Sequence, residues 1–269
     1  MKCLSSKIDL TGESALIRWI AAGCVCLLTV FWTPPAQAQS DEIQVYDGGL
    51  AEPGKFNLTW HNNYTFRGST DSPTPGGIPV NHSLNGVTEW AYGVNSWLEL
   101  GLYLPLYTLG KGHAATDGYK LRALVAKPDA AHQRFFYGLG FELSQNAKRW
   151  DDHKTTSEFR PIVGWHLGKW DVIFNPILDT AYDGFSKLVF APSTRVAYNY
   201  SERYAFALEE YADFGQISDL AHGSEQSHQV FAVVDYAGSK FEIQGGIGFG
   251  LTRAADDLVG KLIVAWDLN

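Results

Sequence analysis

The sequence predicts an all-β protein: a transmembrane antiparallel up-and-down β-barrel of about twelve strands. After residue 39, segments of about ten residues carry an apolar side chain at every second position. Short and longer polar gaps alternate between these segments, as the periplasmic turns and outer loops of outer-membrane barrels do. Aromatic side chains gather at the segment ends beside the short gaps, which is typical of headgroup-level girdles. A closed barrel also lets every strand cross lipid with its backbone groups paired.

Residues 1–38 are typical of a secretory signal peptide that is cleaved on export. Basic residues precede and flank an apolar run at 19–32, and Ala36-Gln37-Ala38 forms an A-x-A cleavage site. We therefore expect the mature chain to start at Gln39. Two alternatives remain: an uncleaved anchor, which needs about 20 apolar residues, and a lipid-anchored start at Cys24.

Composition narrows the classes of protein further. All three cysteines (Cys3, Cys24 and Cys26) lie in the leader, so the mature chain has no thiol for a disulfide, a metal site or a nucleophile. The leader takes three of the 21 basic and two of the 29 acidic residues, which leaves a net charge of −9 and disfavours nucleic acid as a partner. The mature part contains no apolar run of helical membrane-span length, which excludes a helical membrane protein.

The segment at 97–104 shows the alternation most clearly. Its leucines occupy the even positions, and Glu99 and Gly101 face the other way. The same pattern recurs at 135–144, 241–251 and 258–268. A soluble β-sandwich also alternates, but with its apolar face buried and its charged face in water. Strands of about ten residues, tilted by about 40°, match an apolar band about 25 Å tall and favour the barrel.

The aromatic residues beside the short gaps favour the barrel as well, because a sandwich has no reason to collect them at one end. They are Tyr92, Phe135, Trp170, Tyr200, Tyr204, Tyr236 and Phe241. Two places depart from the alternation. Glu210 falls on an apolar face, which either a position near the outer end of its strand or a bulge would explain. The segment at 230–236 is apolar on both faces, and we assign its Asp235 to the interior.

Four stretches carry a family resemblance: Pro53-Gly54-Lys55-Phe56-Asn57-Leu58, Glu89-Trp90-Ala91-Tyr92-Gly93-Val94, Trp97-Leu98-Glu99-Leu100-Gly101 and Phe159-Arg160-Pro161-Ile162. Through them the chain resembles a family of outer-membrane barrels named for the meta-pathway of phenol degradation. The resemblance implies a passive channel or transporter for small solutes, and the family name alone suggests small aromatic or hydrophobic compounds. One departure concerns assembly. Such barrels usually end in an aromatic residue, and this chain ends Ala265-Trp266-Asp267-Leu268-Asn269.

The face opposite the apolar one collects charge, and we expect it to line the interior. The expected pore-lining residues are Glu89, Glu99, Lys120, Arg122, Glu142, Glu158, Arg160, Arg195, Glu209, Glu242 and Lys261, with Asp171 and Asp235 on the same face. This pattern has two interpretations. One is a ladder of ion pairs that fills a small barrel. The other is a narrow path whose charged rings select solutes.

Opposite charges on neighbouring strands predict specific pairs. We expect Arg122 to lie between Glu99 and Glu142. We also expect Arg195 to pair with Glu209. The third expected pair joins Glu242 and Lys261.

The sequence predicts no catalytic site, metal site or cofactor. Ser144 has no histidine in a recognisable motif, and the eight histidines offer no H-x-H or HExxH spacing. The glycines at 245–250 lack the lysine of a phosphate loop. The expected partners are outer-membrane lipids, a small solute and the barrel assembly machinery. Residues 39–54 are expected to form a periplasmic segment or a partial plug before the barrel at 55–269. A lipid-modifying barrel enzyme and a closed structural or adhesion barrel are the competing functions.

Overall fold

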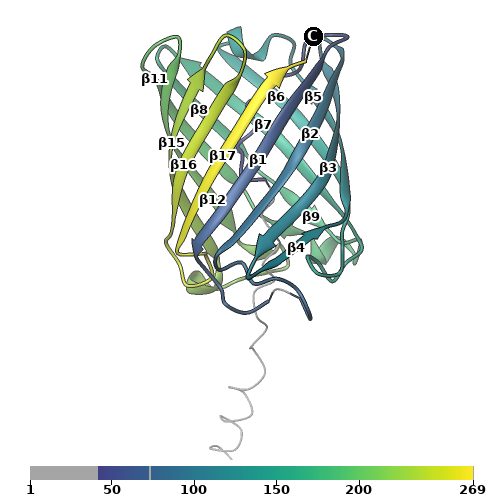
Figure 1. The fold of residues 1–269 in the computed structure, drawn as a ribbon. Helices are drawn as coiled ribbons and strands as arrows, with labels where there is room; N and C mark the ends of the chain where they lie inside the picture. The colour runs from purple at the N-terminus through teal and green to yellow at the C-terminus, as the bar shows by residue number, and fades with distance from the viewer. Residues whose placement is uncertain (1–41, 73, 269) are drawn as a thin grey trace, which may run out of the picture. The chain divides into compact units, whose positions relative to one another are not determined.

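The computed structural model describes residues 42–72 and 74–268, so the expected signal peptide at 1–38 lies outside the described residues. The described residues form a closed antiparallel β-barrel, in which β1 pairs with β2 on one side and with β17 on the other (Figure 1). The expected fold class is confirmed. Within these residues, no helix is long and apolar enough to cross a membrane.

Twelve long strands make up the wall over the described residues. They are β1 (Phe56–Arg67), β2 (Ser83–Asn95), β3 (Leu98–Gly110), β5 (Tyr119–Ala126), β6 (Phe135–Gln145), β7 (Thr155–Leu167), β8 (Trp170–Asn175), β11 (Ser193–Asn199), β12 (Tyr204–Asp213), β15 (Ser227–Ala237), β16 (Glu242–Gly250) and β17 (Leu258–Asp267). The short pieces are β4 (His113–Thr116), β9 (Leu178–Thr180), β10 (Val189–Phe190), β13 (Gly215–Gln216) and β14 (Asp219–Leu220). Three 3₁₀ turns complete the elements: η1 (Ala130–His132), η2 (Phe185–Lys187) and η3 (Gly223–Glu225).

The connections differ in length at the two ends of the barrel. At one end the links β2–β3, β7–β8, β11–β12 and β15–β16 are tight turns, and the β5–β6 link contains η1. At the other end the links are longer and carry the short strands. The start of β1 and the end of β17 lie together at the short-turn end, where Asn57 pairs with Asp267. In outer-membrane barrels the short turns face the periplasm and the long loops face outward, so we expect the same orientation here.

The expected alternation separates an apolar outer face from a polar inner face. On β3, Leu102 is 37% exposed whereas its neighbour Tyr103 is fully buried and Glu99 is only 4% exposed. The expected girdle is present too: Phe56 and Tyr92 lie 4.8 Å apart between ring centroids, and Tyr204 and Tyr236 lie 5.3 Å apart. An apolar exposed face of this extent suits hydrocarbon rather than water.

Both departures from the alternation have physical explanations. Glu210 keeps its register with Thr194 and Val230, so the bulge explanation is wrong. It lies near the long-loop end of β12, where His228 Nδ1 contacts its carboxylate at 3.1 Å. The segment of β15 that is apolar on both faces places Phe231 inward, against apolar residues of the interior.

The third strand contains an irregularity that the alternation did not predict. Pro105 has no N–H to donate, and the ladder with β2 shifts register there, between Val87 and Glu89. The Thr88 hydroxyl donates to the Leu104 carbonyl at 2.6 Å. The Trp90 ring N–H donates to the same oxygen at 3.1 Å. Beyond this point the faces of β3 exchange, so that Leu106 is buried inside and Tyr107 lies on the outer face.

The cost of a charge on the outer face should depend on its depth. We expect Leu102→Arg, near the middle of the apolar band, to lower the free energy of unfolding by about 2–4 kcal/mol. The same substitution at Leu109, on the outer face near the long-loop end, should cost about 0–1 kcal/mol. Denaturant unfolding in phospholipid vesicles measures both. Equal losses for the two variants would contradict the assignment of this face to lipid.

Candidate functional site: the charged lumen

The strands bring most of the expected pore-lining residues into the interior. Glu89, Glu99, Arg122, Glu142, Arg160, Arg195, Glu209 and Lys261 are buried there, and Lys120 and Glu158 are partly buried. Glu242 alone among them is exposed, at the short-turn end of β16. The buried charges fall into three clusters, which are centred on Arg122, on Arg195 with Lys261, and on Arg160.

Arg122 holds two carboxylates. Its guanidinium forms ion pairs with Glu89 and with Glu99. The expected partner Glu99 is confirmed, and β5 and β6 do align Arg122 with Glu142. The expected position between Glu99 and Glu142 is nevertheless wrong, because the guanidinium reaches across β3 towards β2. Glu142 instead forms an ion pair with Lys120 at 3.2 Å.

The second cluster joins four strands. Arg195 forms ion pairs with Glu209 and Asp235, which confirms the expected Arg195–Glu209 pair. The expected Glu242–Lys261 pair is wrong. The register places Lys261 opposite Gly246, and its ammonium group forms an ion pair with Glu209 on β12. The space at Gly246 is crowded, since a Cβ there would lie 2.9 Å from Val233 and 3.4 Å from the Lys261 side chain.

The third cluster ties the wall to the segment that precedes β1. Arg160 binds Glu158 through two hydrogen bonds of 2.6 and 3.0 Å and donates to the Gln44 carbonyl at 3.0 Å. The carboxylate of Glu42 lies 3.9 Å from the same guanidinium. Burial opposes its ionisation, but Arg160, His61 and Lys120 outweigh burial and hold the pKa of Glu42 at about 2. Glu42 is therefore ionised at neutral pH.

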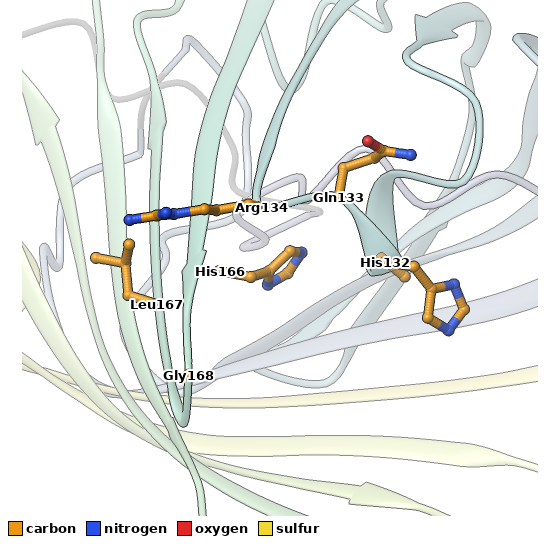
Figure 2. A pocket seen from close by; sticks show the side chains of 7 residues that line it. His132, Gln133, Arg134, His166, Leu167 and Gly168 are labelled. Atoms are coloured by element: carbon orange, nitrogen blue, oxygen red, sulfur yellow. The ribbon is translucent and has the colours of Figure 1, made fainter.

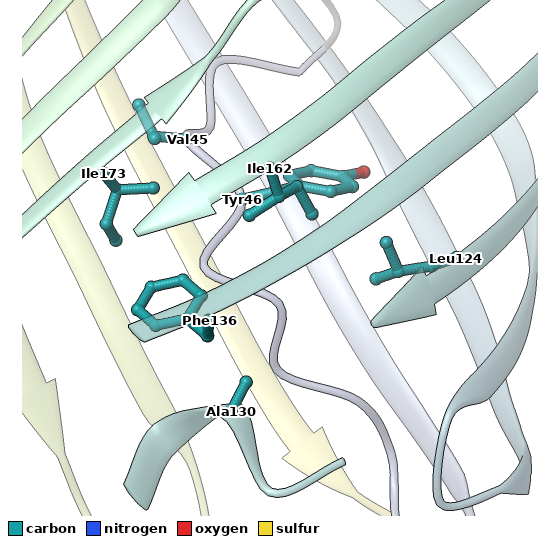
Figure 3. Packing of buried hydrophobic residues seen from close by; sticks show 7 residues of the cluster. All are labelled: Val45, Tyr46, Leu124, Ala130, Phe136, Ile162 and Ile173. Atoms are coloured by element: carbon teal, nitrogen blue, oxygen red, sulfur yellow. The ribbon is translucent and has the colours of Figure 1, made fainter. Parts of the chain in front are cut away.

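Residues 42–54 run through the interior of the barrel rather than beside it (Figures 1 and 3). The Asn175 side chain, on the inner face of β8, accepts from the Tyr46 N–H at 2.7 Å and donates to the Tyr46 carbonyl at 3.0 Å. The Tyr46 and Tyr103 hydroxyls lie 2.6 Å apart. Further along, the Ala51 N–H donates to Glu99 at 2.5 Å. Gly54 donates to the Gly93 carbonyl at the short-turn end.

Apolar contacts fix the same segment. Val45 and Tyr46 pack against Leu124, Ala130, Phe136, Ile162 and Ile173 of the wall and the η1 turn (Figure 3). Ile43 packs in a second cluster with Ala197, Ala207, Phe231, Val233 and Val259. We did not predict these wall residues as part of the site. Their signal in the sequence is an apolar side chain on the parity that otherwise carries charge.

A separate hollow of about 530 Å³ opens at the short-turn end, between the η1 turn and the β7–β8 turn (Figure 2). It is lined by 131–134 and 166–168. His166 stacks on Phe136 and contacts the Asp171 carboxylate at 2.6 Å through Nδ1. The sequence did not predict this hollow either, because it forms where the η1 turn and the β7–β8 turn lie beside each other.

The described residues contain no group of three or more His, Cys, Asp or Glu that could hold a metal ion. The Ser144 hydroxyl donates to the Glu142 carboxylate at 3.3 Å rather than to a histidine. The arrangement suits the binding and passage of polar groups.

No protein-family model matches the chain. No curated protein matches it either. Several solved structures share its fold. The COG4313 outer membrane channel from Pseudomonas putida F1 matches with a TM-score of 0.57 and 14% identity over 84% of this chain and 100% of that one. A KdgM porin matches with a TM-score of 0.52 and 8% identity over 79% of this chain and 99% of that one. The NanC porin matches with a TM-score of 0.52 and 9% identity over 79% of this chain and 100% of that one. These proteins are porins and channels rather than enzymes. At such identities the likeness shows the fold.

Removing Arg122 should leave two buried carboxylates without their cation. We expect Arg122→Met to lower the free energy of unfolding by about 3–5 kcal/mol. Adding Glu89→Gln and Glu99→Gln should restore most of the loss, since the unpaired charges disappear. Lys120→Met, at a more hydrated pair, is the matched control and should cost less. Denaturant unfolding in vesicles gives all three values, and a triple variant no more stable than Arg122→Met would contradict the pairing.

Proposed function

We propose that this protein is a passive channel of the outer membrane that conducts small solutes. One observation carries the proposal: a closed barrel, apolar outside, encloses a lumen whose wall carries organised charge. The fold is that of porins and an outer membrane channel. Buried polar and charged groups are costly unless they are paired or hydrated, and a barrel built only for structure can fill its interior with apolar side chains at lower cost.

Residues 42–54 serve in this proposal as a partial plug. The segment occupies part of the lumen, and three contacts seat it: the Asn175 amide, the Arg160 guanidinium and the Lys261 ammonium group, which donates to the Ile43 carbonyl at 3.2 Å. The two interpretations of the charged face then apply together. Some ion pairs anchor the plug, and the remaining charged surface borders a narrow path.

The solute class follows from the resemblance to barrels of the phenol meta-pathway. Small aromatic or other hydrophobic compounds are therefore the first solutes to test. Liposomes containing the purified barrel should take up such compounds faster than empty liposomes. A lipid-hydrolysing activity in the same vesicles would instead support the enzyme alternative.

Loosening the plug should raise conductance. Asn175→Ala removes both hydrogen bonds to the Tyr46 backbone, so we expect more frequent or larger openings in planar bilayers than for the wild-type protein. Deleting 42–51 should have the largest effect. Ser193→Ala is the matched control, because Ser193 is buried opposite Asn175 and its hydroxyl has no hydrogen-bond partner. A protein that stays silent in all forms, including the deletion, would refute the channel.

The ionisable groups on the lumen side should make the channel favour cations. The acidic ones outnumber the basic ones: Glu42, Glu89, Glu99, Glu142, Glu158, Asp171, Glu209 and Asp235 against Lys120, Arg122, Arg160, Arg195 and Lys261. Reversal-potential measurements should show a cation preference.

Neutralising lumen carboxylates should then weaken that preference. We expect Asp171→Asn combined with Asp235→Asn, at two partly exposed lumen carboxylates, to lower the ratio of cation to anion permeability. Asp219→Asn removes an exposed charge of β14, outside the lumen, and should leave the ratio unchanged. An anion-selective wild-type channel would contradict this assignment of charges to the path.

A further inference from the structure

The outer face of the barrel contains a groove that the channel proposal does not use. It has a volume of about 620 Å³ and crosses β15, β16, β17 and β1. Its sides include Trp60, Phe66, Val234, Ile247 and Leu262, all on the outer face. The groove therefore opens towards the space that lipid chains occupy in a membrane.

Gly245 leaves open space in the groove, whereas the Phe66 ring lies over Gly260. Gly245 and Gly260 occupy outward positions in β16 and β17, between strands with large side chains. A Cβ at Gly245 would meet nothing within 4 Å, so the missing side chain leaves open space. At the long-loop side the groove is closed by Tyr64 and Phe66, whose rings lie edge to face at 4.8 Å.

Among the residues that line the groove, Asn62 carries an amide and Lys261 an ammonium group. Asn62 faces outward on β1, between Leu262 of β17 and Gly86 of β2, and is only 8% exposed. Its Oδ1 accepts a hydrogen bond from the Tyr107 hydroxyl at 2.6 Å. That hydroxyl in turn accepts from the Trp60 ring N–H at 2.8 Å. The Asn62 Nδ2 is buried and has no hydrogen-bond partner.

The direction of the free amide follows from this chain of hydrogen bonds. Tyr107 reaches Asn62 across Gly86, where a side chain would overlap its hydroxyl. Oδ1 of Asn62 is therefore turned towards β2 and β3. The amide nitrogen diverges from the oxygen on the same planar carbon, so Nδ2 is turned away from Tyr107, on the side of β17 and the groove. A buried N–H donor without a partner is costly, so an acceptor from outside the chain fits this position.

We propose that the groove binds one acyl chain of an outer-leaflet lipid, and that an oxygen on that chain accepts a hydrogen bond from Asn62 Nδ2. Asn62 is the seventh residue of the twelve in β1, which runs from the short-turn end to the long-loop end. Leu58, four residues earlier, aligns through Trp90 with Leu102 near the middle of the apolar band, so Asn62 lies on the long-loop, outer-leaflet side of that level. The oxygen must sit some carbons below the headgroup, as in hydroxylated and acyloxy-substituted fatty chains.

Other chemical classes fit the groove less well. The lining offers no free cation to a phosphate, since Lys261 directs its ammonium group inward to Glu209 and Gln244. An unsubstituted chain would fill the apolar part and leave Nδ2 without an acceptor. The proposal concerns the membrane face alone and does not depend on whether the lumen conducts.

Native mass spectrometry of the full mature chain in detergent tests the proposal. The probes are lipid A with hydroxylated and acyloxy-substituted chains, and a synthetic analogue with the same headgroup and unsubstituted chains. Asn62→Leu removes the donor at similar size. Gly245→Leu fills the groove from a position with room for a side chain. Ala123→Leu, at an outward position of β5, is the matched control.

We expect one lipid A to bind, with Kd raised about five- to tenfold by Asn62→Leu, which corresponds to one lost hydrogen bond. Gly245→Leu should abolish the one-to-one complex, and Ala123→Leu should leave it unchanged. The analogue should bind more weakly and be insensitive to Asn62→Leu. Gly245→Leu leaves Asn62 intact, so the test stands even if Asn62→Leu fails to fold.

Three results would overturn the proposal. Lipid A binding that is equal in all variants would show that the groove is not the site. Equal affinity for the two probes would show that no chain oxygen is recognised. A dimer that disappears with Gly245→Leu would show that a second copy of the chain covers the groove.

Discussion

The pairing of β1 with β17 is the constraint on which the rest of this structure depends. Inside a membrane an unpaired strand edge has no water to bind, so the sheet has to close. Closure gives each residue of a long strand one of two environments, lipid or lumen. That division explains why Leu102 and Tyr103 are adjacent in sequence and yet exposed and fully buried, respectively. It also confines the charged side chains to a small common space. Each of them then needs a partner there, because solvent is scarce.

The lumen meets that need in a way that strand pairing alone could not provide. Neighbouring strands supply ion pairs, but the N–H donors of a guanidinium or an ammonium group point in several directions, so a single carboxylate does not meet them all. Residues 42–54 supply the missing acceptors, because their backbone carbonyls have no sheet partners of their own. The Ile43 carbonyl accepts from Lys261, and the Gln44 carbonyl accepts from Arg160. The segment in turn needs an apolar surface for Ile43 and Val45, and inward residues such as Phe136 and Phe231 provide it. The segment therefore supplies hydrogen-bond acceptors to the wall, and the wall supplies apolar contacts to the segment.

Much of the fold could be predicted from the sequence, because a side-chain period of two maps directly onto inside and outside. The strands, the girdle and the inward charges all follow from that period. The individual ion pairs do not. Arg122 and Lys261 have long side chains that pass over a neighbouring strand, so their partners depend on which residues between are small. Gly101 opposite Arg122 is such a residue, since a Cβ there would lie 3.1 Å from Arg122 Nε, and this role is visible only in three dimensions. The sequence around Tyr46 has no strand periodicity, so it did not predict where Tyr46 lies inside the barrel.

The inner and outer faces of the wall differ in how many hydrogen-bond partners they offer to a buried polar group. A polar group that faces inward finds partners among many other polar groups, as Glu209 does with Arg195 and Lys261. A polar group that faces outward has only the few neighbours that the wall itself provides. The outward carbonyl of Leu104, freed by Pro105, is met by Thr88 and Trp90. Asn62 is met on one side by Tyr107 and on the other by nothing in the described chain. An outward polar atom that the wall does not satisfy is thus a stronger sign of an external partner than any inward one. The unsatisfied amide therefore indicates a binding site in the groove of the outer face. The lumen charges pair with one another, so they do not indicate which solute passes.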